Sequence, residues 1–166
     1  MRKGIIIGII LGIILFVLLI TVLIVLVFVL PSVFEGKKIE NIKHMYFTYT
    51  SGYAMNSYAT YTLDCNDKCI LKVKQLGVPE EETKETEIPK EKLEEIANKL
   101  TEYNVSRWNG FRKSDKYVLD GDSFSFNLDY NDNDEIRASG YMMWPNNYGN
   151  VKSYLIDTFN EYIKEK

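Results

Sequence analysis

The first thirty residues contain an apolar segment that restricts what the chain can fold into. From Ile5 to Leu30 no side chain carries a charge, and Thr21 is the only polar side chain. A helix of this length spans roughly 39 Å at about 1.5 Å per residue, whereas the hydrocarbon core of a bilayer is about 30 Å thick. The sequence therefore predicts one transmembrane helix over residues 5–30, preceded by a cytoplasmic tail of residues 1–4.

The alternative to a permanent anchor is a cleaved signal peptide. The apolar core of a signal peptide has only ~7–15 residues and ends at a small-x-small cleavage site, which does not follow here. No cysteine stands at a lipid-attachment position, because the first one is Cys65. We therefore expect an uncleaved signal anchor, hence a single-pass protein of the plasma membrane, with a linker over residues 31–42.

The orientation of this anchor rests on weaker signals. Basic residues flank the span on both sides, so the positive-inside rule does not decide. A four-residue tail before the span is the usual layout of a signal anchor, and long domains translocate largely regardless of charge. We expect residues 43–166 to form an extracytoplasmic domain.

The segment "DCNDKC" points to a disulfide. Cys65 and Cys69 flank three residues that are typical of a hairpin loop. Opposite positions on paired strands bring Cβ atoms to about 4.5–5.5 Å, near the spacing of a disulfide. Two free thiols are the alternative, while two cysteines with only His44 as a further ligand do not make a zinc site. A disulfide would indicate an oxidising, extracytoplasmic compartment.

The predicted membrane helix also carries a glycine repeat. Gly4, Gly8 and Gly12 stand four residues apart, and this spacing lets two transmembrane backbones approach closely. Self-association into a homo-oligomer is one interpretation. The ordinary glycine content of membrane helices is the other.

The rest of the chain shows the periods of strands and helices. Apolar and polar residues alternate over 45–49, over 55–63 and again over 123–130, which predicts strands. Helical spacing follows Pro89, and again from Val151 to the C-terminus. We predict an α+β domain of ββαββα order, an antiparallel sheet of two hairpins with two helices on one face.

The acidic segment "LDYNDNDEI" invites comparison with a calcium loop. Counted from Asp129, an EF-hand needs glycine at position 6 and glutamate at position 12, but Asp134 and Gly140 stand there. Asn and Asp are favoured in tight turns. We predict a hairpin turn, and neither a metal nor a cofactor.

Candidate catalytic residues are few. A histidine-based triad would need His44, and Asp120 with Asp122 could serve acid–base work, although a turn around Gly121 explains those two residues as well. The net charge of −3, with no basic stripe, argues against binding nucleic acid. We do not expect an enzyme.

Aromatic residues beside glycine and proline form the candidate binding surface. "WNGF" contributes Trp108 and Phe111, and "MMWPNNY" contributes Trp144 and Tyr148. Together they could form a platform for a peptide or a sugar. The alternative is that they pack beneath the seam between the sheet and the helices.

The stretches "WNGFRKSDKYVLDGDSFSF" and "ASGYMMWPNNYGNVKSYL" carry a family resemblance. The chain resembles, over roughly residues 43–162, a family of small lipoproteins and membrane-anchored proteins of low-GC Gram-positive bacteria that has no assigned activity. The residues that carry the likeness are Trp108, Gly110, Phe111, Asp120, Gly121, Ser123, Phe124, Gly140, Tyr141, Pro145 and Tyr148. The resemblance implies the fold and an envelope location, but no reaction.

We therefore expect a membrane-anchored extracytoplasmic binding module, with an envelope protein or a glycan as partner. The alternatives are an accessory subunit of a membrane complex, an envelope enzyme and a pilin-like assembly subunit. Ile9 in place of the usual glutamate, and Pro31 at the end of the span, count against the last of these.

Overall fold

The protein is represented by a computed structural model that describes residues 2–26, 36–51, 59–75, 79 and 82–164, without the side chains of residues 2–11 and 164. Two compact units divide the chain, Met1–Glu35 and Gly36–Lys166.

The first unit contains helix α1 (Arg2–Ile24). Among the residues that the structure describes, no helix combines the length and the apolar character needed to cross a membrane. This finding contradicts the predicted transmembrane helix over 5–30, the signal anchor and the single-pass plasma-membrane location. Residues 27–30 of that prediction lie outside the described residues.

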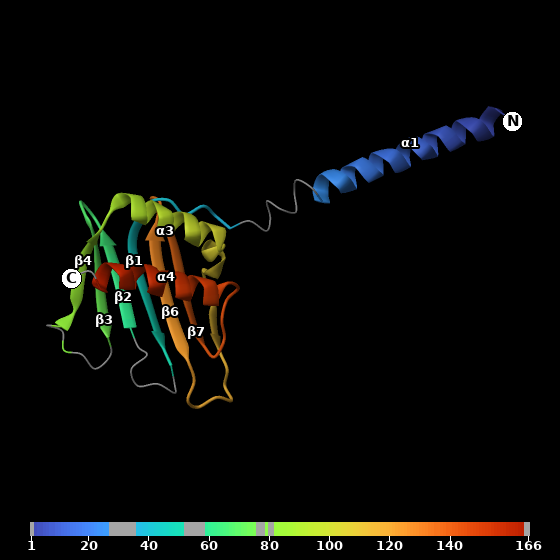
Figure 1. Cartoon of the computed structure of the whole chain (residues 1–166). Helices are drawn as coiled ribbons and strands as arrows, with labels where there is room; N and C mark the ends of the chain where they lie inside the picture. The colour runs from blue at the N-terminus through green and yellow to red at the C-terminus, as the bar shows by residue number, and fades with distance from the viewer. Residues whose placement is uncertain (1, 27–35, 52–58, 76–78, 80–81, 165–166) are drawn as a thin grey trace. The chain divides into compact units, whose positions relative to one another are not determined.

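The second unit is built on one seven-stranded sheet with the order β4-β3-β2-β1-β6-β7-β5 (Figure 1). Neighbouring strands run antiparallel, except that β5 pairs parallel with β7. The strands are β1 (Ile42–Thr50), β2 (Ala59–Cys65), β3 (Cys69–Gln75), β4 (Lys84–Ile88), β5 (Arg112–Ser114), β6 (Ser123–Tyr130) and β7 (Asp134–Tyr141).

The predicted fold class is therefore wrong, both in its membrane helix and in its sheet. The sheet is mixed and has seven strands instead of two antiparallel hairpins. Three additional strands make the difference. β4 and β5 widen the sheet at its edges, before and after α3 (Lys90–Glu102), and β1, β2 and β3 stand where one hairpin was predicted.

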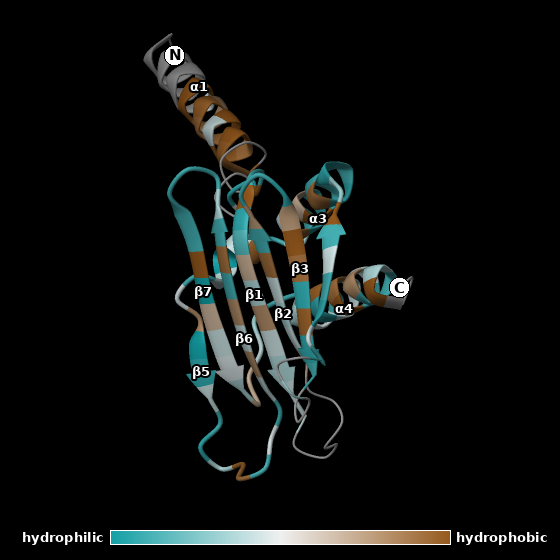
Figure 2. Cartoon of the chain, turned by 90° about the vertical axis from the view of Figure 1, so that its left-hand side faces the viewer, coloured by the Kyte–Doolittle hydropathy of each residue, from teal (hydrophilic) through white to brown (hydrophobic). Residues whose placement is uncertain are grey.

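Helices α3 and α4 (Tyr148–Lys164) lie on the same face of the sheet (Figures 1 and 2). Strand residues that point toward these helices are buried with Ile96 and Leu100 of α3 and with Leu155 and Phe159 of α4. The 3-10 helix η3 (Val105–Trp108) adds Trp108 to this core. The largest fully buried strand side chains are Met45, Phe47, Leu63, Leu71, Phe126, Leu128 and Ile136. Among the described helices of this unit, none lies over the opposite face (Figures 1 and 2).

The tight turn predicted at "NDND" joins β6 to β7. Asn131 adopts a positive φ of 51°, which asparagine tolerates better than most residues. Its backbone N–H donates to the carbonyl oxygen of Asn41 at 2.9 Å, and its Oδ1 accepts from the backbone N–H of Glu40 at 3.1 Å. Lys37 pairs with Asp134. The turn thus ties the start of the domain to the sheet. The described residues contain no group of three or more His, Cys, Asp or Glu side chains that could hold a metal ion.

Cys65 and Cys69 form a disulfide, and the predicted pairing is confirmed. The two residues stand opposite each other where β2 turns into β3, with Cα atoms 4.0 Å apart.

Candidate binding face

The side of the sheet that faces away from α3 and α4 carries mostly polar side chains on its central strands, and we call it the open face (Figure 2). On the central strands, side chains that alternate with the buried aromatic and aliphatic residues point to this side. Its half-buried members are Tyr46, Thr48, Thr50, Thr60, Thr62, Ser123, Ser125, Asn127, Ser139 and Tyr141.

The register of the strands brings these residues into rows. Tyr46 on β1 stands between Thr62 on β2 and Asn127 on β6. One step along the strands, Thr48 stands between Thr60 and Ser125. Because the side chains of paired residues lie on the same face, each row crosses three strands with hydroxyl and amide groups.

Some of these groups hydrogen-bond to each other. The hydroxyl of Thr60 donates to that of Thr48 at 3.1 Å, and the hydroxyls of Thr50 and Ser123 lie 2.6 Å apart. Other polar side chains of the open face have no hydrogen-bond partner among the described residues. Within the described part of the chain, no hydrogen bond engages the side chains of Tyr46, Ser125, Asn127 or Ser139. These donors and acceptors face solvent.

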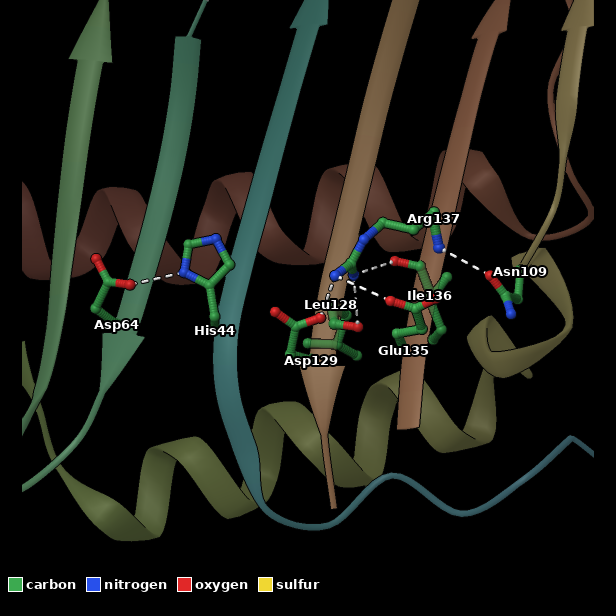
Figure 3. A network of polar contacts seen from close by, with 8 residues as sticks. All are labelled: His44, Asp64, Asn109, Leu128, Asp129, Glu135, Ile136 and Arg137. Carbon is green, nitrogen blue, oxygen red and sulfur yellow. Dashed lines mark hydrogen bonds and ion pairs between the residues drawn. The ribbon is translucent and has the colours of Figure 1, made fainter. Parts of the chain in front are cut away.

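The end of the open face near the β6–β7 turn is charged (Figure 3). His44 Nδ1 lies 2.7 Å from Asp64 Oδ1. Next to this pair, the Arg137 guanidinium contacts Asp129 and lies 3.3 Å from a carboxylate oxygen of Glu135. Arg137 also donates to the carbonyl oxygens of Leu128 and Ile136. The charges at this end satisfy one another.

The His44–Asp64 pair resembles half of a catalytic triad. A carboxylate at Nδ1 orients the imidazole so that Nε2 is the free nitrogen. Among the described contacts, however, no hydroxyl or thiol nucleophile reaches His44. Asp120 and Asp122 belong to the connector before β6, at the opposite end of that strand from Asp129, which pairs with His44. The structure does not bring the candidate catalytic residues together.

The predicted aromatic surface is largely part of the core. Trp108 is 2% exposed, and its indole Nε1–H donates to the carbonyl oxygen of Asn146 at 3.0 Å. Tyr148 is 8% exposed, and burial raises the pKa of its hydroxyl. Phe111 is partly buried, and the centroid of its ring lies 6.2 Å from that of Phe124.

Trp144 is the one predicted aromatic residue with a large exposed area, 38%. Its ring stacks on Tyr148, with centroids 4.6 Å apart. Two nearby segments, 117–119 and 142–144, expose further apolar side chains, and we call them the apolar end. Its members are Tyr117, Leu119, Met142, Met143 and Trp144.

The glycine repeat remains a prediction. Gly4 and Gly8 lie outside the residues whose side-chain surroundings are described. A Cβ at Gly12 would meet nothing within 4 Å.

No family model, no curated protein and no solved structure matches the chain. The resemblance to a lipoprotein family stays an expectation, and the functional argument depends on the geometry.

Analysis of the sequence missed the open face, although a signal was present. In "YFTYT", "ATYTLD" and "SFSFNLD" the polar positions of alternating strands hold Thr, Ser, Tyr and Asn in place of the Lys and Glu common on solvated strands. This choice of residues marks the face.

Proposed function

We propose that the unit of residues 36–166 is a binding module whose open face takes a carbohydrate. The observation that carries the proposal is a set of hydroxyl and amide groups around Tyr46 that no described contact engages. They lie at the centre of a sheet face that neither α3 nor α4 covers (Figure 2).

The residue types support a binding role. Tyr, Ser and Asn are the side chains that antibody paratopes favour, because tyrosine supplies contact area at a low cost in conformational entropy while serine and asparagine adapt their hydrogen bonds. The open face carries these types at its centre, and its charged residues on β1, β2 and β6 are confined to the row of His44.

The same chemistry favours a polyhydroxylated ligand. A sugar presents hydroxyls that both donate and accept, which matches the free side chains of Ser125, Asn127 and Ser139. The half-buried ring of Tyr46 offers an apolar surface among them. Ordered strands hold these groups in place, so little entropy is lost on binding.

The test is a binding screen of the full-length chain against immobilised neutral and acidic oligosaccharides. Tyr46→Ala should lower the affinity for the bound saccharides at least about tenfold, since it removes the central contact. Tyr117→Ala is the matched control, because Tyr117 is 96% exposed and stands outside the open face. Equal binding by both variants, or no binding by the unaltered chain, would overturn the proposal.

A second candidate is a protein-binding surface at the apolar end. Its supporting observation is the exposure of Leu119 and Tyr117, at 92% and 96%, together with the partial exposure of Trp144. Exposed apolar patches mark interaction sites. Crosslinking with Trp144→Ala and Leu119→Ala would test it, since both should lose a partner that Tyr46→Ala keeps.

A further inference from the structure

A shallow hollow of about 430 Å³ extends over β5, β7 and β6 at one edge of the open face. The register places Arg112 opposite Ser139, and both Ser114 and Ser123 opposite Tyr141. Since paired residues share a face, these five side chains stand on the same side of the sheet. On the open face the hollow therefore combines the Arg112 cation, three serine hydroxyls and one aromatic ring. Lys113, Phe124 and Gly140, which alternate with these residues along their strands, also line it.

Arg112 has no partner for its charge among the residues that the structure describes. Within the described residues it makes no ion pair and no hydrogen bond through its side chain, and it is exposed. Arg137, on the neighbouring strand β7, differs from Arg112. Its guanidinium contacts two carboxylates and two backbone carbonyl oxygens. The fold thus neutralises one arginine of the open face and leaves the other available.

Some hydroxyls of the hollow have hydrogen-bond partners within the described residues and others do not. Ser123 is engaged with Thr50, and the Tyr141 hydroxyl donates to the carbonyl oxygen of Leu119 at 2.7 Å. The described contacts leave the hydroxyls of Ser114 and Ser139 free. Ser139 stands opposite Arg112 in the β5–β7 ladder, and Ser114 lies two residues further along β5 on the same face. Two free donors therefore accompany the free guanidinium.

A planar guanidinium binds carboxylate, sulfate and phosphate through two parallel N–H···O bonds, and such charge-assisted bonds are about twice as strong as neutral ones. The net charge of the whole chain is −3, so general attraction does not draw anions to this surface. We infer that the saccharide bound at the open face carries an oxyanion substituent, held by Arg112 with Ser114 and Ser139. This inference rests on the proposed function and specifies its ligand.

The experiment compares a matched pair of ligands on the full-length chain, a galacturonate hexasaccharide and its methyl ester, by isothermal titration. The acid should bind about ten- to a hundredfold more tightly than the ester, as expected for a charge-assisted hydrogen-bonded pair. Arg112→Gln should remove that difference and leave binding of the ester unchanged. Arg112→Lys should keep only part of the preference for the acid, since lysine keeps the charge but cannot form the two parallel hydrogen bonds of a guanidinium.

Lys116→Gln is the control, because it removes a cation from the connector that follows β5. It should leave the preference for the acid intact. If acid and ester bind equally and Arg112→Gln changes neither, the inference is overturned while the carbohydrate proposal stands. If neither saccharide binds, and the wider oligosaccharide screen is also empty, both are overturned.

Discussion

The indole Nε1–H of Trp108 donates a hydrogen bond to the carbonyl oxygen of Asn146, 3.0 Å away and 38 residues later in the chain. The bond ties η3 to the connector that leads into α4. Around it, Trp108 packs edge-on against Phe126, with ring centroids 5.4 Å apart. Trp108 is therefore a structural residue that fixes the aromatic cluster between the sheet and the start of α4.

Trp108→Ala should lower the free energy of unfolding by about 3–5 kcal/mol, the usual cost of replacing a fully buried large aromatic residue with alanine. Trp144→Ala should cost clearly less, because Trp144 is only partly buried. Urea denaturation of the two variants gives both values. A larger loss for Trp144→Ala would contradict the assigned packing.

Acid should weaken the anchoring of the β6–β7 turn. A hydrogen bond from Lys37, and a second from Asn131, lower the pKa of Asp134 below its ordinary value of 3.8. A lowered folded-state pKa gives stability that is complete above the ordinary value and is lost as the pH falls through the folded value. At pH values below about 4, the urea concentration at the unfolding midpoint should fall as the pH is lowered. This fall should be smaller in Asp134→Asn.

Asp132→Asn is the matched control for this titration. Asp132 lies on the same turn, but its carboxylate is fully exposed and 4.0 Å from Lys43. Its variant should follow the pH profile of the unaltered chain. A profile shared by Asp134→Asn and the unaltered chain would show that Asp134 does not contribute.

The disulfide should stabilise the β2–β3 hairpin by a modest amount. Cys65 and Cys69 enclose only three residues, and the chain-entropy model gives about 2 kcal/mol for a loop this short. The Cys65→Ser, Cys69→Ser double variant should remain folded with an unfolding free energy lower by roughly that amount. Urea denaturation of the unaltered chain with a reductant should give the same value, and unfolding on reduction would contradict it.

Gly140 should tolerate no side chain. A Cβ there would clash with the backbone carbonyl oxygen of Met143, in the connector that follows β7. Gly140→Ala should therefore destabilise the fold, by about 1–3 kcal/mol as for other overpacked sites. Gly149→Ala in α4 is the control, since a Cβ there meets nothing within 4 Å. Thermal unfolding should show a lowered midpoint for the first variant only.

Local periodicity made parts of the fold predictable. The alternation of Phe124, Phe126 and Leu128 with polar residues correctly marked one face of β6 as buried. Helical spacing after Pro89 placed the start of α3 within one residue of Lys90. The cysteines at the ends of a three-residue loop identified the β2–β3 hairpin.

Pairing between distant segments was not predictable in the same way. β1 pairs with β6 although Phe47 and Phe126, which stand opposite each other, are 79 residues apart, and no local pattern encodes such a contact. β5 is three exposed residues long, so it shows no alternation. The burial of Trp108 follows from its contacts with Tyr148 of α4 and with the connector before it. The sequence offered packing at this seam as the alternative to an exposed platform, but the local pattern alone did not decide between the two.

The most direct test of the carbohydrate proposal is to map the bound saccharide on the protein. Amide chemical shifts of the ¹⁵N-labelled full-length chain are recorded while the galacturonate hexasaccharide is added. The predicted changes centre on Tyr46, Ser125, Asn127 and Ser139, with a smaller effect in α3 and α4. Changes confined to residues 117–119 and 142–144, or to the two helices, would contradict binding at the open face.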